Sequence, residues 1–161
     1  MFFVATAAPD GRVNVSPKGL DSLRVLDANR IVWMNLSGSG NETAAHLRET
    51  SRMTLMFCAL TGPALILRTY GQARTFHPAD PEWASRKVLF PPMAGARQIF
   101  DLTIDLVQTS CGTGVPLMDV VQQRGEEELL PFYDKMGPDG VKAYWQRKNR
   151  FSIDQRPTGI A

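Results

Sequence analysis

Residues 100–106 show the clearest alternation of apolar and polar side chains in the chain. Every second residue is Phe, Leu, Ile or Leu, and the residues between them are Asp, Thr and Asp. A period of two is typical of a strand with one buried and one exposed face. This segment therefore predicts a strand within a sheet.

Five further segments have the pattern of strands. Residues 2–8 are apolar and end at Pro9-Asp10-Gly11, which suits a tight hairpin turn, and residues 12–16 alternate as the returning strand. The other three predicted strands are apolar runs next to turn residues, at 31–36, 53–60 and 65–76, the last with Gly71 as an expected bulge. Six strands at these spacings predict a mainly β fold, a six-stranded antiparallel barrel.

Helical patterns occur within the predicted barrel. Ser39-Gly40-Asn41-Glu42 has the form of a capping box, so we expect a helix with Ser39 as N-cap that runs to about Thr50. Asp80-Pro81-Glu82 predicts a second helix with Asp80 as N-cap, and Pro91-Pro92 ends it.

The composition shifts to helix formers after the sixth predicted strand. Residues 116–124 and 138–149 are predicted helices, and the second has Val141, Tyr144 and Trp145 on one face. We therefore expect a single domain over residues 1–161, with a barrel core at 1–112 and a helical C-terminal extension at 113–161.

Length and composition agree with one globular domain and exclude several classes of protein. The 161 residues are 43% hydrophobic and 21% charged, enough for one core but cramped for two. The net charge of +2 does not indicate nucleic-acid binding, and we interpret the basic cluster at 147–150 as a solvated helix end. No apolar run reaches the roughly 18 residues of a membrane span, and the first residues lack the basic region and cleavage site of a signal peptide. Cys58 and Cys111 form no disulfide framework, so we expect a cytoplasmic protein.

Familiar catalytic motifs are missing from the chain. His46 and His77 are far apart and not at metal-ligand spacing, and we expect them on a helix surface and at a strand end. Cys58 is an expected core residue, and Cys111 lies in a polar, glycine-rich turn with no evident base. There is no P-loop and no dinucleotide-binding fingerprint. These patterns disfavour hydrolases, kinases and Rossmann dehydrogenases, predict no metal site, and assign no catalytic residue.

Two segments have the composition of an anion site. Residues 15–19 end a strand with a hydroxyl and an ammonium group, and residues 36–43 lead from a strand into a helix start rich in small residues and hydroxyls. Backbone N–H groups at such a start favour a phosphate, and Lys18 would close the site as a point charge. A hairpin lysine beside an ordinary capped helix accounts for the same residues equally well.

The order of several short motifs resembles a known family. These are Val-Ser-Pro-Lys-Gly at 15–19, Ser-Gly-Ser-Gly-Asn-Glu-Thr at 37–43, His-Leu-Arg-Glu at 46–49, Arg-Met-Thr-Leu-Met-Phe at 52–57, Arg-Thr-Tyr-Gly at 68–71 and Gln-Thr-Ser-Cys-Gly at 108–112. Together they resemble the pyridoxamine 5′-phosphate oxidase-like family of FMN-binding split barrels, over roughly residues 1 to 125.

The resemblance implies FMN bound at a homodimer interface, in two symmetry-related sites. By position, Ser16 and Lys18 match the strand end that contacts the flavin and its phosphate. The turn and helix start that hold the phosphate are matched by Ser37, Asn41 and Thr43. Arg97 and Gln108 are two further candidates for contacting the cofactor, from the partner subunit; the alternative is that they are surface and turn residues.

The chain also departs from the oxidase itself. The oxidase has a basic pair near the helix start, where this chain has Glu42 and Thr43, and its C-terminal substrate motif with Arg and His is replaced by residues 152–157. The resemblance therefore implies an FMN-dependent oxidoreductase whose small-molecule substrate is unknown. The alternatives are a carrier or sensor that binds a flavin, haem or deazaflavin without turnover, and a homodimer that has lost its cofactor.

Overall fold

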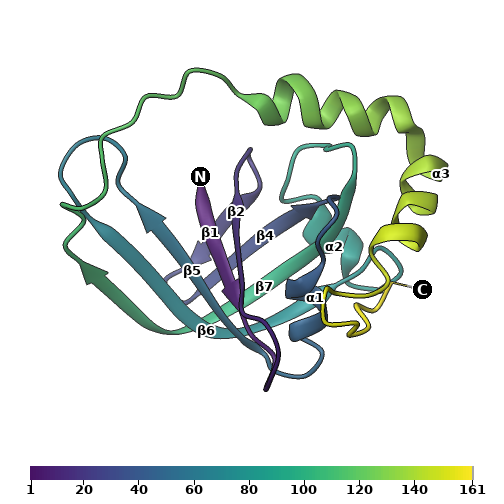
Figure 1. The fold of residues 1–161 in the computed structure, drawn as a ribbon, viewed down its shortest axis with the longest axis horizontal. Helices are drawn as coiled ribbons and strands as arrows, with labels where there is room; N and C mark the ends of the chain where they lie inside the picture. The colour runs from purple at the N-terminus through teal and green to yellow at the C-terminus, as the bar shows by residue number, and fades with distance from the viewer. Residues whose placement is uncertain (161) are drawn as a thin grey trace.

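Seven antiparallel strands form one curled sheet in the computed structural model, which describes residues 1–160 (Figure 1). Residue 161, the end of the predicted domain, lies outside the described residues. The order in the sheet is β2-β1-β5-β6-β7-β4-β3, so β2 and β3 are its two edges. The strands are β1 (Phe2–Thr6), β2 (Asn14–Lys18), β3 (Leu23–Asp27), β4 (Arg30–Leu36), β5 (Arg52–Cys58), β6 (Ile66–Phe76) and β7 (Ala96–Ser110).

The mainly β class is confirmed, but the sheet has seven strands where the sequence predicted six. The additional strand is β3, which pairs with β4. Its residues, Leu-Arg-Val-Leu-Asp, are half-buried or exposed and show no alternation that marks a buried face. The predicted bulge is present, because the pairing of β6 with β7 shifts register between Tyr70 and Gly71.

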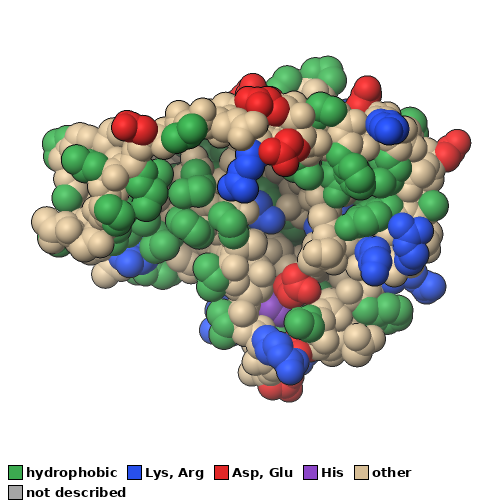
Figure 2. Space-filling model, turned by 45° about the horizontal axis from the view of Figure 1, so that its top comes forward, with side chains coloured by type: hydrophobic (Ala, Val, Ile, Leu, Met, Phe, Trp, Pro, Cys, Tyr) green, Lys and Arg blue, Asp and Glu red, His purple; other side chains and the backbone are tan. Residues whose placement is uncertain are grey.

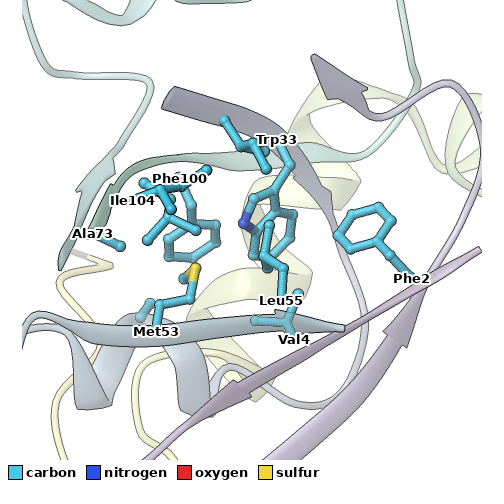
Figure 3. Close-up of a cluster of buried hydrophobic side chains, with 11 residues drawn as sticks. Phe2, Val4, Trp33, Met53, Leu55, Ala73, Phe100 and Ile104 are labelled. Atoms are coloured by element: carbon cyan, nitrogen blue, oxygen red, sulfur yellow. The ribbon is translucent and has the colours of Figure 1, made fainter. Parts of the chain in front are cut away.

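The inner face of the curled sheet encloses the main core (Figure 3). Trp33 of β4 stacks on Phe100 of β7, with ring centroids 4.5 Å apart, and meets Phe2 of β1 edge-on at 6.0 Å. Strands β1 and β4 are not neighbours in the sheet, so this contact shows how strongly the sheet curls. Each fully buried side chain of this kind contributes roughly 1.5–3 kcal/mol to the stability of the barrel.

Within the described residues, four helices accompany the sheet: α1 (Glu42–His46), α2 (Trp83–Lys87), the π-helical turn η1 (Gly125–Leu129) and α3 (Leu130–Lys148). None of the helices within residues 1–160 is long and apolar enough to cross a membrane. The prediction of a helix at 116–124 is wrong, because residues 116–123 have no regular secondary structure. The helix predicted at 138–149 is the second part of α3, which bends at Gly137, where φ is 70°.

The capping predictions for the first two helices are wrong. The N-cap of α1 is Asn41 instead of Ser39, and the Glu42 side chain does not reach back to it but accepts a hydrogen bond from the Ile153 backbone N–H at 3.2 Å. The N-cap of α2 is Glu82, while the carboxylate of Asp80 accepts the N–H of His77 at 2.7 Å. In both cases the carboxylate accepts a hydrogen bond from a backbone N–H group outside the helix that it was predicted to cap.

His46 lies inside the protein, although the sequence predicted a helix-surface residue. Its side chain is 1% exposed, and Nδ1 lies 3.1 Å from the Thr6 hydroxyl. Asn14 Nδ2 donates to the same hydroxyl at 3.3 Å. Burial lowers the pKa of His46, and a hydrogen bond with the Thr6 backbone and the charge of Glu42 only partly oppose this. The ring is therefore a neutral structural link between β1 and α1.

The C-terminal segment after α3 folds back onto the start of the chain (Figure 1). Asp154 pairs with Arg12, and Arg156 pairs with both Asp10 and Glu49. The basic residues of the cluster at 147–150 are exposed at the end of α3, as expected, but Asn149 between them is completely buried.

Candidate anion and cofactor site

A cavity of about 280 Å³ lies between the edge strand β2 and the loop that follows β4. Strand β2 contributes Asn14, Ser16 and Lys18, β7 contributes Arg97, and the loop contributes residues 35–43. The cavity thus brings together six of the seven predicted site residues, namely Ser16, Lys18, Ser37, Asn41, Thr43 and Arg97. Figure 2 shows a hollow near the middle of one face of the molecule with basic side chains in it.

Arg97 is a buried cation in the wall of this cavity, and it reaches the cavity from its own subunit. It is 2% exposed, and its guanidinium donates to the carbonyls of Gly38 at 3.1 Å and Gly40 at 2.8 Å and to Gln98 Oε1 at 2.9 Å. Burial lowers the pKa of Arg97 to about 10, with Tyr133, Tyr144 and Glu42 opposing the shift. It remains charged at neutral pH, surrounded by neutral acceptors.

Lys18 faces the same cavity without a carboxylate to pair with. Its Nζ lies 5.6 Å from the centre of the Trp33 ring. Burial, and then the charge of Arg97, lower the pKa of Lys18 to about 8, while Glu42 raises it. Neither Lys18 nor Arg97 is part of an ion pair formed within residues 1–160. Two repelling cations in a partly dry cavity favour an anion between them.

Glu42 is the one acidic side chain among the residues described as lining this cavity. Its Oε1 is turned toward the C-terminal segment by the hydrogen bond from Ile153. The lining therefore keeps a net positive charge, from two cations against one carboxylate, although it is less basic than a lining without Glu42.

Ser37 and Asn41 use their side chains within the protein. The Ser37 hydroxyl donates to the carbonyl of Gly95 at 2.7 Å and accepts from Trp145 Nε1 at 2.7 Å. The Asn41 amide accepts from Gln98 at 3.1 Å and donates to the carbonyl of Asn149 at 3.0 Å. These two side chains shape the loop, whereas Ser16 and Thr43 present hydroxyls to the cavity.

Gln108 is the one predicted site residue that the structure leaves outside the cavity. It is exposed near the C-terminal end of β7, where its Oε1 accepts a hydrogen bond from the Tyr70 hydroxyl at 3.0 Å. Contact between Gln108 and a cofactor in this cavity requires a second subunit.

A second cavity, of about 450 Å³, adjoins the first and shares Lys18 and residues 35–37 with it. Its walls include apolar side chains of Met34 and Leu129, and residues 122–125 line it from the C-terminal extension. The sequence did not predict that the extension lines this cavity, because residues 113–125 contain none of the motifs that resemble the family.

The family is decided by comparison with known proteins. Residues 1–111 match the family model described as pyridoxamine 5′-phosphate oxidase. The chain belongs to this family. A pyridoxamine 5′-phosphate oxidase family protein of Aspergillus flavus, ustO, is 38% identical over 138 residues, which are 83% of this chain and 55% of that protein. The chain thus spans about half the length of this curated relative.

Two solved structures share the fold. HupZ of Group A Streptococcus aligns with a TM-score of 0.53 at 18% identity, over 66% of this chain and 81% of that one. A pyridoxamine 5′-phosphate oxidase-related, FMN-binding protein of Nostoc punctiforme aligns with a TM-score of 0.52 at 13% identity, over 71% and 75%. At these identities the similarity establishes the fold alone.

Proposed function

We propose that this protein binds FMN, with the phosphate held between Lys18 and Arg97, and acts as an FMN-dependent oxidoreductase on a small molecule. The observation that carries the proposal is a pair of cations at one cavity, the buried Arg97 and the half-buried Lys18, neither of which forms an ion pair within residues 1–160. A phosphate dianion is the kind of ligand that offsets two such charges.

The donor groups around the cavity fit a phosphate. A guanidinium has five N–H donors, and Arg97 uses three in the hydrogen bonds described above, so two remain for a ligand. The Thr43 hydroxyl accepts from Asn14 at 3.0 Å and keeps its own hydrogen to donate. Ser16 adds a second hydroxyl beside Lys18.

The adjoining cavity suits the remainder of the cofactor, because it combines apolar walls with polar groups of Asn35 and Ser22. FMN supplies the redox chemistry itself, and the protein supplies binding, orientation and electrostatics. A transfer of electrons to the flavin needs no acid–base side chain of the protein, so the absence of a catalytic triad within residues 1–160 is compatible with the proposal.

A homodimer belongs to this proposal. Several apolar side chains of the β2 hairpin and of β7 are exposed, among them Val13, Val15, Leu106 and Val107. Exposed apolar groups gathered on a sheet favour association, and a two-fold dimer is its commonest form. Gln108 lies two residues after Leu106 and therefore on the same face of β7, so an interface that includes Leu106 is the route by which Gln108 would reach the flavin site of the partner subunit.

The absorbance of freshly purified protein tests the proposal. We expect the two visible bands of a flavin, and a rise in melting temperature when FMN is added to the apoprotein. A colourless protein whose melting temperature does not respond to FMN contradicts the proposal.

The main alternative is a carrier or sensor that binds a cofactor without turnover. Glu42 favours it, because a carboxylate in the cavity weakens the attraction for a phosphate. The same spectrum separates the two: a Soret band identifies haem and the band of a deazaflavin identifies that cofactor, whereas FMN that is reduced and reoxidised with a substrate identifies an enzyme.

A further inference from the structure

Asn149 connects the C-terminal segment to the loop of the anion site. It is the first residue after α3 and is completely buried, although the residues on both sides of it are basic and exposed. Its Oδ1 has no hydrogen-bond partner within the described residues. The position of this amide is therefore set by what its nitrogen contacts.

The Asn149 amide nitrogen holds the loop through its carbonyl groups. It donates to the carbonyl of Gly38 at 2.8 Å and to that of Ser39 at 3.3 Å. Arg97 donates to Gly38 as well and to Gly40. Arg97 and Asn149 together thus bind the carbonyls of residues 38, 39 and 40, and Asn149 is the donor to the middle one, that of Ser39.

These bonds fix the orientation of the peptide groups of the loop. The C=O and N–H of a trans peptide point in opposite directions, and the described chain contains no cis peptide. While the carbonyls of residues 38–40 point to Arg97 and Asn149, the N–H groups of residues 39–41 point away from those two donors. If the Ser39 carbonyl were released, it would be free to turn and present a partial negative charge to the bound phosphate.

The C-terminal segment in turn holds Asn149 in place. The Asn149 carbonyl accepts from Asn41 Nδ2 at 3.0 Å and from the Thr158 hydroxyl. The ion pairs of Asp154 and Arg156 fasten the same segment to the first hairpin and to Glu49. Asn149 therefore approaches the loop from a rigid support.

We propose that Asn149 is a positioning residue of the phosphate site, and that it makes the C-terminal segment a determinant of selectivity for phosphorylated ligands. The inference rests on the proposed function. It assigns a role to a residue beyond the 1–111 region that matches the family model.

The test compares the affinities of FMN and riboflavin, which differ only in the phosphate, for the purified apoprotein of full length. Asn149→Ala removes both donated bonds, so we expect FMN binding to weaken about tenfold, in line with the loss of one or two hydrogen bonds. Riboflavin affinity should stay within about twofold, because riboflavin has no phosphate for the loop to hold.

Ser152→Ala is the matched control. Ser152 is buried in the same segment and accepts the N–H of Arg156 at 3.2 Å, but it makes no contact with the loop. This variant should lower the melting temperature while it preserves the wild-type ratio of FMN to riboflavin affinity. A merely structural role of Asn149 predicts the same behaviour for Asn149→Ala.

The outcomes separate the inference from the proposed function. An unchanged affinity ratio in Asn149→Ala overturns the inference, and a wild-type protein that does not prefer FMN over riboflavin overturns the phosphate site itself. If Asn149→Ala does not fold, Asn149→Ser, which keeps one donor, replaces it. We then expect a smaller decrease in the ratio of FMN affinity to riboflavin affinity. A ratio equal to that of the wild type again overturns the inference.

Discussion

Lys18 and Arg97 carry their charges into one cavity, but the protein compensates for the two charges differently. Arg97 has lost nearly all contact with water and replaces it with bonds to two carbonyls and one amide. The ammonium group of Lys18 lies over the face of Trp33 and forms no ion pair within residues 1–160. A cation–π contact replaces hydration less completely than hydrogen bonds do, so Lys18 is the residue whose charge depends most on a ligand.

Replacement of Lys18 by methionine keeps the aliphatic chain and removes the charge. We expect Lys18→Met to weaken FMN binding by roughly 1.5–3 kcal/mol, about 10- to 150-fold, the range for a hydrogen bond to a charged group. Riboflavin affinity should change little. Titration calorimetry with both ligands measures this, and Lys135→Met, at an exposed position of α3, is the control. Equal losses for the two ligands would show that Lys18 shapes the ring pocket instead.

The pH dependence of FMN binding reports on the same residue. Because the pKa of Lys18 in the apoprotein is about 8, Lys18 is charged at pH 7 and loses its proton above pH 8. FMN stays a dianion over this range, since the second phosphate pKa is about 6. We expect FMN affinity to fall between pH 8 and 9, approaching tenfold per pH unit, and to stay nearly constant in Lys18→Met. A flat profile in the wild type would contradict a contact between Lys18 and the phosphate.

The stability of the apoprotein should change with pH in the opposite direction to FMN affinity and rise above pH 8. The pKa of Lys18 is lower in the folded chain than its ordinary value of 10.5, so its charged form is disfavoured by folding. This penalty is complete below pH 8 and disappears as the pH rises from 8 to 10.5. The cavity thus carries a destabilising charge in the absence of a ligand, which is consistent with a binding function.

At the level of elements, the long pair β6–β7 determines the shape of the sheet. The two strands pair over eleven positions and shift register at Gly71. A Cβ at residue 71 would lie 1.9 Å from the backbone oxygen of Thr103, a distance that no side chain tolerates. The bulge therefore requires glycine because of this close approach, and its φ is not the reason.

Gly71→Ala should destabilise the protein by at least about 1–3 kcal/mol, the range for overpacking in a rigid site. The backbone of β7 has to move, since the clash is with main-chain atoms. Denaturant unfolding measures the loss. Gly114→Ala is the control, because a Cβ there meets nothing within 4 Å, and it should change stability by less than about 0.5 kcal/mol. Similar stabilities of the two variants would contradict the tight approach of β6 and β7.

At the scale of the whole molecule, the chain leaves apolar surface on the sheet that its own helices do not cover. Val15 is 62% exposed on β2, and Leu106 and Val107 are 58% and 51% exposed on β7. Helix α3 and the C-terminal segment lie over other parts of the molecule, near α1 and α2 (Figure 1). This leaves the exposed strands available to a second subunit.

Light scattering at micromolar concentration should therefore give twice the chain mass of 17.9 kDa. Leu106→Glu places a charge on the proposed interface, and we expect it to yield monomer and to weaken FMN binding, because Gln108 of the partner subunit is then withdrawn. Val121→Glu, at a residue that is 95% exposed on the connection after β7, should leave both properties unchanged. A wild-type monomer would contradict the dimer and the shared flavin site together.

Local patterns in the sequence determined much of the fold and part of the site. Alternation and turn residues located six of the seven strands, since these signals depend on neighbouring residues alone. The segments 15–19 and 36–43 likewise reveal their donors locally, and the structure brings both segments to one cavity. Strand β3 was not predicted, because this edge strand is little buried and its sequence has no alternation of apolar and polar residues.

Only the tertiary structure decided how each polar side chain of the site is used. The Arg97 guanidinium meets a carbonyl 57 positions away in the chain, and the Asn149 amide meets one 111 positions away. The same long-range packing buried His46 and drew Glu42 away from its own helix toward the C-terminal segment. Hydrogen bonds and burial depend on distances in space, and residues so far apart in sequence are brought together only when the sheet curls and the C-terminal segment closes over it.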